Sequence, residues 1–374
     1  MKPFDFIIIG GGIAGVLSAY ELRRFNTLLI DEDGILTSGA SAAAGAFLFP
    51  KVGFDTAYTR FINNAILKAL NFYEKIGIDT HKMGVTLFPR DERDFEKFKN
   101  YEKEIKLPFE KRKEGFFFKD GGVVFPEDVR EKIKVNFEAV KVETLYKDGE
   151  FWSVGKYKTK NVILATGYKD LIKTPYIKIH PVWGERIEGN GEWRIENGEL
   201  ENARKNMLFH KNCSVGIIDG IMKIGATHKR NCLDCRENEE EAYELIQKAR
   251  EIVDIQNFKI SKIIGGFRAA SVDYFPVVGK IIDVDESLKN NPKTVKGAMP
   301  KALNYIEGLY IVNGMGGRGF SNAVYTAKAL KEHIINGKDL GFLDTKRLFI
   351  KWARKQGEEY LKMENEKWKM KNEK

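Results

Sequence analysis

The sequence predicts an α/β fold built around a parallel β-sheet, and three short apolar runs are the basis of this prediction. Phe6–Ile9 and Thr27–Ile30 lie near the N-terminus, and Gly308–Asn313 lies near the C-terminus. Short and mainly apolar, they resemble strands that are buried on both faces. Val16–Arg24, between the first two runs, has apolar residues at helical spacing. Strand, helix and strand in this order are typical of a parallel sheet covered by helices.

A glycine-rich turn joins the first strand to this helix. Residues 10–15 read Gly-Gly-Gly-Ile-Ala-Gly and match the pattern G-x-G-x-x-G. In this pattern Gly10 makes a tight turn, Gly12 lets a pyrophosphate approach the backbone, and Gly15 lets helix and strand pack closely. The pyrophosphate lies at the helix N-terminus, where free N–H groups and the helix dipole favour an anion. We therefore expect Gly10, Gly12, Ile13, Ala14 and Gly15 to contact a dinucleotide.

The second strand ends on an acidic residue, which completes this unit. Asp31 lies 21 residues after Gly10, where a carboxylate can accept hydrogen bonds from the hydroxyls of the adenosine ribose. Glu32 follows it and is a second candidate. A further apolar strand, Asn161–Leu164, runs into Ala165-Thr166-Gly167. The N-terminal unit alone does not decide between FAD and NAD.

A second glycine loop, Gly314–Gly319, follows the strand Gly308–Asn313 and precedes a helical stretch from about Ser321 to Ile335. It also matches G-x-G-x-x-G and could be a second nucleotide site. However, no strand intervenes between this helix and the next acid, Asp339, so no second βαβ unit is completed. We interpret the loop as a helix N-terminus directed at the same cofactor, where it would stabilise negative charge on the N1–C2=O edge of a reduced flavin.

The composition excludes several classes of protein. The chain has 374 residues, of which 43% are hydrophobic and 31% charged, so it is not a disordered chain. The length fits about two domains or one large composite domain. No run of about 18 apolar residues exists, so no membrane span is expected. Three cysteines cannot form a secreted disulfide framework, and we expect a cytoplasmic protein.

The formal net charge is +9, from 62 basic and 53 acidic residues. This excess is compatible with RNA, an acidic membrane surface or acidic small substrates, and also with a lysine-rich solvated surface. Thr345–Lys374 hold 10 basic and 5 acidic residues, a net charge of +5, with four interleaved aromatic residues: Phe349, Trp352, Tyr360 and Trp368. Two interpretations of this tail stay open, namely an RNA contact or an amphipathic helix docked on the protein.

The cysteines also leave alternatives open. Cys232 and Cys235 form a C-x-x-C pattern, and Cys213, His210 and His228 lie within 25 residues of it. Four of these side chains could bind zinc, although their spacing is irregular. The C-x-x-C pair could instead form a redox disulfide, or the thiols could be inert.

Together, the N-terminal unit, Gly39-Ala40-Ser41, Ala165-Thr166-Gly167 and the C-terminal glycine loop resemble the D-amino-acid oxidase superfamily. The resemblance runs from Asp5 to about Lys355. Its members include glycine oxidase and sarcosine oxidase, which use FAD to oxidise a C–N bond next to a carboxylate. It implies a Rossmann-like FAD-binding domain with an inserted antiparallel-sheet substrate domain, an α/β (α+β) fold of the D-amino-acid oxidase type.

Within this superfamily the chain resembles the FAD-dependent C-terminal domain of the MnmC proteins, bifunctional enzymes of tRNA 5-methylaminomethyl-2-thiouridine biosynthesis. The segments that carry this resemblance are Gly39–Ala46, Pro181–Glu185, Ile224–His228, Gly266–Gly279, Gly316–Ser321 and Lys346–Phe349. There are two departures. Those proteins begin with a methyltransferase domain, for which we expect no room before Gly10, and they carry an Arg in the segment that here holds Trp183.

The resemblance implies a reaction and roles for two residues. The substrate would be a tRNA wobble uridine that carries a carboxymethylaminomethyl group, which is an N-alkylglycine. A hydride would pass from its glycyl carbon to flavin N5, and hydrolysis of the imine would give glyoxylate and an aminomethyl uridine. Arg268 stands where the superfamily binds the substrate carboxylate, and Arg318 would lie at the flavin pyrimidine edge or over the substrate. We expect both to be catalytic, and no Asp, Glu or His is a convincing general base.

The resemblance also implies the remaining contacts. Small residues would line the pyrophosphate and flavin, and the expected additional FAD contacts are Gly39, Ala40, Ser41, Ala44, Gly45, Ala165, Thr166, Gly167, Gly316, Gly317, Gly319, Phe320 and Ser321, together with Arg318 itself. No metal and no membrane is expected, and a separate methyltransferase could use the product.

We expect a discontinuous FAD-binding domain (residues 1–75, 120–175 and 262–345), a substrate domain (76–119 and 176–261) and a basic tail (346–374). Two other functions stay open. One is oxidation or dehydrogenation of free glycine, sarcosine or a D-amino acid. The other is a non-catalytic, FAD-stabilised module that binds tRNA.

Overall fold

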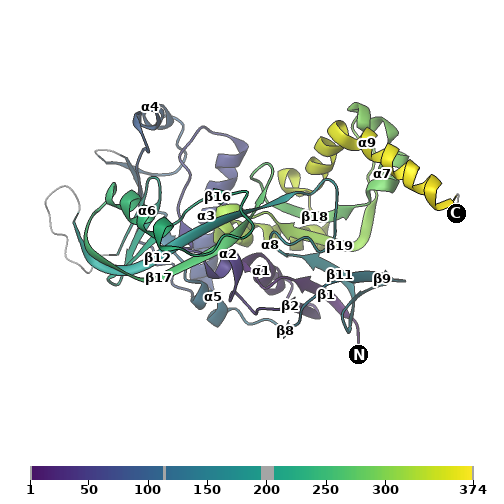
Figure 1. Ribbon diagram of the computed structural model, residues 1–374, viewed down its shortest axis with the longest axis horizontal. Helices are drawn as coiled ribbons and strands as arrows, with labels where there is room; N and C mark the ends of the chain where they lie inside the picture. The colour runs from purple at the N-terminus through teal and green to yellow at the C-terminus, as the bar shows by residue number, and fades with distance from the viewer. Residues whose placement is uncertain (1, 113–114, 195–205, 373–374) are drawn as a thin grey trace.

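The computed structural model describes residues 2–112, 115–194 and 206–372. Two large β-sheets form its framework, and Figure 1 shows them side by side along the long axis of the molecule. The first sheet has the strand order β18-β19-β11-β1-β2-β8, with the hairpin β9-β10 added beside β11. Its strands are β1 (Phe4–Ile9), β2 (Thr27–Asp31), β8 (Phe137–Ala139), β9 (Leu145–Asp148), β10 (Phe151–Val154), β11 (Tyr157–Leu164), β18 (Val277–Ile282) and β19 (Tyr305–Asn313). The five strands from β19 to β8 are parallel, as the sequence predicts.

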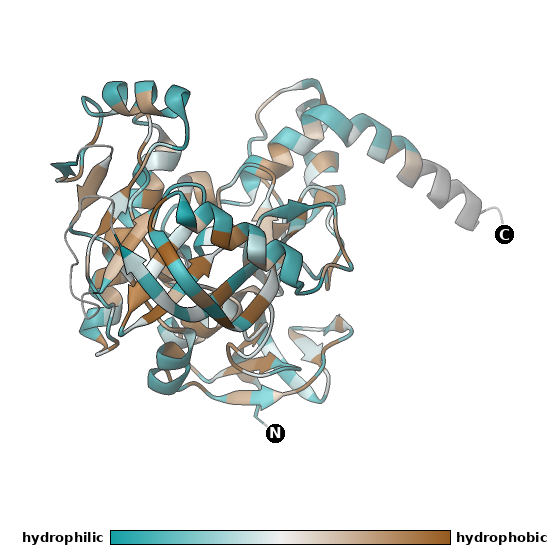
Figure 2. Ribbon diagram, turned by 60° about the vertical axis from the view of Figure 1, so that its left-hand side comes forward, coloured by the Kyte–Doolittle hydropathy of each residue, from teal (hydrophilic) through white to brown (hydrophobic). Residues whose placement is uncertain are grey.

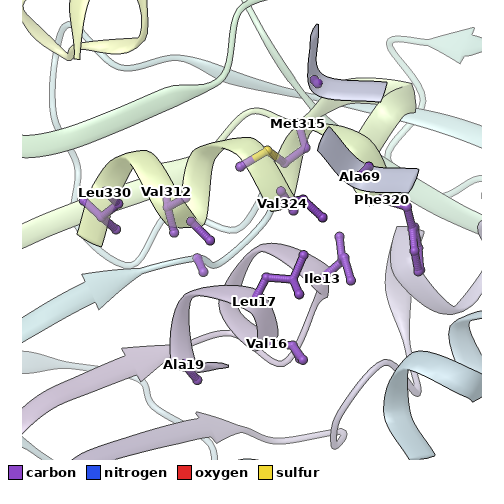
Figure 3. Packing of buried hydrophobic residues seen from close by; sticks show 14 of the residues in the cluster. Ile13, Val16, Leu17, Ala19, Ala69, Val312, Met315, Phe320, Val324 and Leu330 are labelled. Atoms are coloured by element: carbon purple, nitrogen blue, oxygen red, sulfur yellow. The ribbon is translucent and has the colours of Figure 1, made fainter. Parts of the chain in front are cut away.

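Helices bury both faces of this sheet. Alternate residues of β1 enter two different hydrophobic clusters, Ile8 on one face and Ile7 on the other, because successive side chains of a strand point to opposite sides. On the first face pack α1 (Ile13–Glu21), α3 (Ala57–Lys75), α5 (Pro126–Lys132) and α8 (Gly319–Asn336). Figure 3 shows α8 lying across α1, with Phe320 and Val324 near Ile13 and Leu17. This packing fixes the two helix N-termini relative to each other.

The second sheet is largely antiparallel and confirms the expected inserted sheet. Its order is β16-β12-β15-β14-β13-β4-β6-β5, with β17 on the other side of β12. Among the strand pairs of the described residues, only β13–β4 is parallel. The strands are β4 (Val85–Leu87), β5 (Glu110–Lys111), β6 (Phe116–Phe118), β12 (Ile179–Arg194), β13 (Met207–His210), β14 (Ser214–Ile218), β15 (Ile221–Gly225), β16 (Lys229–Arg230) and β17 (Asp254–Ser271). Because β17 is one continuous strand, residue 262 lies inside it, and the division into two domains stays a proposal.

Shorter elements connect and cover the sheets. Helices α4 (Glu92–Tyr101) and α6 (Glu239–Arg250) belong to the part around the second sheet, and α7 (Val284–Asn290) lies near the C-terminal helix (Figure 1). The other elements are α2 (Gly39–Ala42), the strand pair β3 (Phe47–Leu48) and β7 (Gly122–Val123), and the 3-10 turns η1 (Pro292–Lys296), η2 (Gly316–Arg318) and η3 (Gly341–Leu343). In Figure 2 brown, hydrophobic residues gather in the strands, and teal, hydrophilic residues gather on the outer helices.

The basic tail forms helix α9 (Lys346–Asn372), whose first half is docked on the protein. Phe349 and Trp352 are buried in the cluster on the second face of the first sheet, so neither can stack on an RNA base. The hydroxyl of Tyr360 donates a hydrogen bond to Asp285 at 3.0 Å. The side chain of Trp368 lies outside the described residues. Among the helices that the structure describes, none is both long and apolar enough to cross a lipid bilayer.

Candidate cofactor and substrate site

One cavity of about 550 Å³ lies where the carboxyl ends of β1, β2, β11 and β19 meet β12 and β17 of the second sheet. Its volume is in the range of cofactor and small-ligand sites. The structure brings nearly all the predicted site residues to its wall: Gly10, Gly12, Ile13, Ala14, Asp31, Glu32, Gly39, Ala40, Ser41, Ala44, Gly45, Ala165, Thr166, Gly167, Arg268, Gly316, Gly317, Arg318, Gly319, Phe320 and Ser321. Gly15 is the one predicted residue that is not part of this wall.

The first glycine turn has the geometry that its sequence predicts. Gly10 has a φ of +121°, and a Cβ there would lie 2.2 Å from the carbonyl oxygen of Ala165. A Cβ on Gly15 would lie 1.9 Å from the carbonyl oxygen of Gly10, so Gly15 serves the packing of α1 rather than the cavity. Helix α1 begins after Gly12 without a side-chain cap on that residue, and the N–H of Ile13 donates to Ser41 Oγ at 3.0 Å.

Asp31 and Glu32, at the end of β2, both accept hydrogen bonds from neighbouring residues. Asp31 accepts hydrogen bonds from the backbone N–H of Gly11 at 2.7 Å and of Asp33 at 2.8 Å. Glu32 accepts one from Lys169 Nζ at 2.9 Å. A carboxylate has about four acceptor positions, so Asp31 retains capacity for a ribose hydroxyl.

A second helix N-terminus reaches the same cavity. The turn η2 leads directly into α8, which has no side-chain cap at Arg318 and no acidic residue in its first turn. The N-termini of α1 and α8, each with its partial positive charge, therefore lie at two places on the wall of one cavity. Gly12 and Gly317 expose backbone without a side chain at these two places. This arrangement fits FAD, which would place its pyrophosphate at one N-terminus and its pyrimidine edge at the other.

Two arginines face the cavity without an acidic partner. Arg268 Nη1 donates to the carbonyl oxygen of Thr227 at 3.0 Å, and Arg318 Nη1 donates to that of Phe49 at 2.8 Å. Within the described chain neither arginine forms an ion pair with a carboxylate. Burial lowers the pKa of both guanidinium groups, yet arginine keeps its charge in proteins. Two such cations in a cavity are suited to binding a carboxylate ligand.

Glycines place the Arg268 guanidinium. It lies over the backbone of Gly184 in β12, where a Cβ would come within 2.1 Å of Nη2. On the other side, a Cβ on Gly317 would lie 3.8 Å from Arg268 Cδ. The guanidinium is therefore positioned between β12 and η2, beside the wall where the flavin edge is expected.

A turn after β17 connects this arginine to the start of α9. Arg347, in the first turn of α9, pairs with Asp273 through Nε at 2.8 Å and Nη2 at 3.0 Å. Its Nη2 also donates to the carbonyl oxygen of Phe275 at 2.9 Å. Between them Tyr274 has a φ of +67° and a largely exposed side chain at the cavity. The bidentate ion pair thus fixes the turn that follows Arg268.

Phe49, Tyr58 and His210 are among the residues of this cavity wall that sequence reasoning missed. The His210 ring lies 4.6 Å from that of Phe49, and its Nδ1 is 3.0 Å from Ser214 Oγ. Burial, and then the nearby charges of Arg318, Arg90 and Lys51, lower the pKa of His210 to about 4. It is therefore a neutral imidazole at neutral pH.

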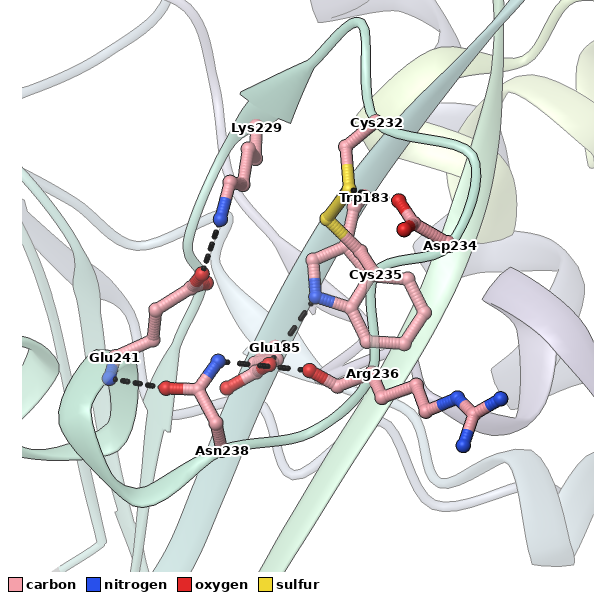
Figure 4. Close-up of a disulfide and its surroundings, with 9 residues drawn as sticks. All are labelled: Trp183, Glu185, Lys229, Cys232, Asp234, Cys235, Arg236, Asn238 and Glu241. Carbon is pink, nitrogen blue, oxygen red and sulfur yellow. Dashed lines mark hydrogen bonds and ion pairs between the residues drawn. A yellow bond between two sulfur atoms is a disulfide. The ribbon is translucent and has the colours of Figure 1, made fainter.

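The C-x-x-C pair forms a disulfide, so inert thiols are the wrong interpretation for Cys232 and Cys235 (Figure 4). Cys213 is a free, buried thiol, and burial raises its pKa to about 12. No group of three or more His, Cys, Asp or Glu side chains in the ranges that the structure describes could hold a metal ion. Beside the disulfide, Trp183 Nε1 donates to the buried Glu185 at 3.1 Å.

With this geometry established, comparison with known proteins shows the family. The profile of the family described as FAD dependent oxidoreductase matches residues 5–333. The chain belongs to this family. As a family member it is an oxidoreductase.

Within the FAD-dependent oxidoreductases, curated relatives carry the name of a tRNA-modifying enzyme. The chain is 22% identical to the tRNA 5-methylaminomethyl-2-thiouridine biosynthesis bifunctional protein MnmC of Shewanella amazonensis, over 95% of the chain and 61% of that protein. It is 24% identical to MnmC of Campylobacter concisus, over 88% of the chain and 56% of that protein. The chain thus spans about three-fifths of the length of these relatives.

Solved structures confirm the fold predicted for this FAD-dependent oxidoreductase. Glycine oxidase from Geobacillus kaustophilus superposes with a TM-score of 0.71 at 17% identity, covering 92% of this chain and 99% of that one. L-proline dehydrogenase from P. horikoshii also superposes with a TM-score of 0.71, at 18% identity, covering 92% and 98%.

Proposed function

We propose that this protein is an FAD-dependent oxidase that removes the carboxymethyl group of 5-carboxymethylaminomethyl-(2-thio)uridine at the tRNA wobble position. The observation that carries the proposal is the pair Arg268 and Arg318, two cations that have no acidic partner among the described residues and lie beside two helix N-termini in one cavity. The similarity to MnmC proteins supports the choice of substrate. The products are 5-aminomethyl-(2-thio)uridine and glyoxylate.

In this proposal FAD occupies the cavity along the first sheet. The α1 N-terminus and Ser41 bind its pyrophosphate, and Asp31 binds its ribose. The N-terminus of α8 with Gly316, Gly317 and Gly319 faces the flavin ring. When bound there, FAD accepts the two electrons of C–N bond oxidation.

The residues of this chain bind and orient the substrate. Arg268 holds the glycyl carboxylate, since a planar guanidinium can pair with both carboxylate oxygens. Arg318, anchored on the Phe49 carbonyl and 4.8 Å above its ring, adds a second positive charge. These cations also raise the energy of a protonated substrate amine, so they lower its pKa and favour the neutral form from which a hydride can leave. No general base is needed for that step, and His210 stays neutral beside it.

The proposed substrate and product also indicate where the enzyme acts and which reaction follows. We place the enzyme in the cytoplasm, together with its tRNA substrate. Its product is a primary amine on the uridine, which a separate methyltransferase would consume to form the methylaminomethyl group.

Incubation of the FAD-loaded protein with tRNA that carries the carboxymethylaminomethyl group tests the proposal. Nucleoside mass spectrometry should show loss of the carboxymethyl group, with one equivalent of glyoxylate released. Free glycine, sarcosine and D-amino acids are the parallel substrates, and unmodified tRNA is the control. If the tRNA stays unchanged while glycine or sarcosine reduces the flavin, the protein is a free amino-acid oxidase or dehydrogenase. If neither substrate reduces it but tRNA binds, the protein is a non-catalytic tRNA-binding module.

A further inference from the structure

A second cavity of about 410 Å³ adjoins the cofactor and substrate site. Phe49, His210 and Arg318 line both cavities, so these three side chains form their common wall. The other walls come from residues 50–54, Thr56 and Thr59, from helix α4 with its preceding residues, and from Leu87, Phe88 and Lys211. The cavity therefore opens on the side of the molecule that carries α4.

Positive charge dominates the wall of this second cavity. Its cations are Lys51, Arg90, Lys97, Lys211 and Arg318, and its acid is Asp94. Arg90 and Lys97 pair with this aspartate, with N–O distances of 3.2 and 4.0 Å, and Lys211 pairs with Glu251 at 3.4 Å. In the described part of the chain, Lys51 and Arg318 have no carboxylate partner. The wall thus carries more positive charge than the protein itself offsets.

Lys51 is held in place at this wall. Its backbone N–H donates to Asn63 Oδ1 at 2.7 Å, and Asn63 Nδ2 donates back to the Lys51 carbonyl at 3.3 Å. Burial and the charges of Arg318 and Arg90 lower the pKa of Lys51. A bound anion would relieve this repulsion, and a lysine ammonium is a common point-charge ligand for phosphate.

Aromatic side chains stand next to these cations. Phe54 is 54% exposed, although it is a large apolar residue, and it contacts Tyr101 edge to face with 5.0 Å between ring centroids. An exposed aromatic ring beside a cluster of cations is the combination that binds single-stranded nucleic acid, because bases stack on the ring and phosphates pair with the cations. A free amino acid has neither a phosphate nor a base that could occupy such a cavity.

We propose that this second cavity binds the phosphate and the base that flank the reacting nucleotide of an RNA substrate. Lys51 and Arg90 bind the phosphate, and Phe54 with Tyr101 supports the neighbouring base. The reacting nucleotide then extends past Phe49 and Arg318 into the first cavity. This inference rests on the proposed function, because it takes RNA as the substrate. It places the RNA contact near α4, at the opposite end of the molecule from α9 (Figure 1).

The test uses FAD-loaded protein and an anticodon stem-loop RNA that carries the modified uridine, with the free modified nucleoside as the small substrate. The variants are Lys51→Gln and Phe54→Ala. Lys99→Gln is the matched control. It also removes one positive charge, but Lys99 lies in α4 and does not line the cavity. Fluorescence anisotropy measures RNA affinity over a range of salt concentrations, and glyoxylate release measures turnover.

We expect Lys51→Gln and Phe54→Ala each to weaken RNA binding by about tenfold or more. They should lower the preference for RNA over nucleoside in kcat/KM by a similar factor. The slope of log affinity against log salt should fall by about one for Lys51→Gln. Lys51→Arg keeps the charge and should retain most of the affinity, which separates the loss of a phosphate contact from misfolding.

Equal effects of Lys51→Gln and Lys99→Gln, or no effect of either cavity variant on RNA affinity, would overturn the inference. The proposed function is judged separately. If the wild-type protein binds the RNA through Lys51 but releases no glyoxylate, the chemistry is wrong and the second cavity is still an RNA site. If it releases glyoxylate and is insensitive to Lys51 and Phe54, the chemistry stands and the RNA lies elsewhere.

Discussion

The position of the Arg268 guanidinium over Gly184 allows a sharp test of its role. Gly184→Ala adds one methyl group to β12 and leaves the arginine in the chain. The new Cβ would lie 2.1, 2.4 and 2.5 Å from Nη2, Cζ and Nη1 of Arg268. These atoms are the far end of a flexible side chain, so the guanidinium should move while the strand stays in place.

The size of the effect follows from the distances. Ordinary contact with a methyl carbon needs about 3.5–4.0 Å, so the guanidinium must shift by more than 1 Å. A misplacement of about 1 Å in a reacting complex can reduce the rate roughly 100-fold. We therefore expect kcat/KM for the modified RNA to fall about 100-fold, which corresponds to about 2.7 kcal/mol of transition-state stabilisation.

Glyoxylate release measures kcat/KM, and the flavin absorption spectrum shows whether FAD remains bound. The matched control is the same substitution in an Arg268→Ala background, where the methyl group meets no guanidinium. Gly184→Ala should then have little further effect, since the two changes act through one side chain. Full activity of Gly184→Ala with FAD bound would refute Arg268 as the carboxylate anchor. Loss of FAD would instead assign this position to the cofactor.

Three further outcomes are expected. Gly15→Ala would place a Cβ 1.9 Å from the Gly10 carbonyl oxygen. Thermal unfolding should show a destabilisation of at least about 3 kcal/mol, and the flavin absorption should show loss of FAD. Normal melting with bound flavin would contradict this. The pKa of His210 is lowered from 6.5 to about 4, so the unfolded chain binds more protons in that range and stability should fall as pH decreases from about 6.5 to 4. Urea unfolding should show that His210→Gln loses about 2–3 kcal/mol less of its free energy of unfolding over this pH range than the wild-type protein. Equal losses would count against a buried neutral imidazole. Truncation after Gly357 tests the alternative RNA contact on α9: with the RNA bound near α4, the salt dependence of tRNA binding should stay unchanged, whereas weaker binding with a flatter salt slope would place α9 in the RNA site.

The parallel sheet and its glycine turn could be predicted because their signals are local. The apolar run of β1, the acid that ends β2 and the tight contact between Gly10 and Gly15 all depend on residues close in sequence. The carboxyl ends of parallel strands lie at one edge of the sheet, so the cofactor wall follows from these segments. Arg268 was found through a family resemblance, because no local pattern marks one arginine in an 18-residue strand.

The rest of the site depends on contacts between distant segments. Phe49 and His210 are separated by more than 150 residues, and β13 brings His210 to Phe49 only when the second sheet has formed. The role of the basic tail, residues 346–374, could likewise not be predicted from local sequence. Its charge and aromatic residues fit either RNA binding or docking, and burial of Phe349 and Trp352 excludes stacking for those two side chains.

The ion pair between Arg347 and Asp273 divides the C-terminal helix into two parts with different tolerance to change. Through this ion pair, the first turn of α9 holds the turn that follows β17, five residues beyond Arg268. A chain cut before Arg347 would leave the Asp273 carboxylate without its guanidinium and release that turn. A fusion partner or affinity tag should therefore be attached after the docked half of the helix, where it leaves the position of Arg268 undisturbed.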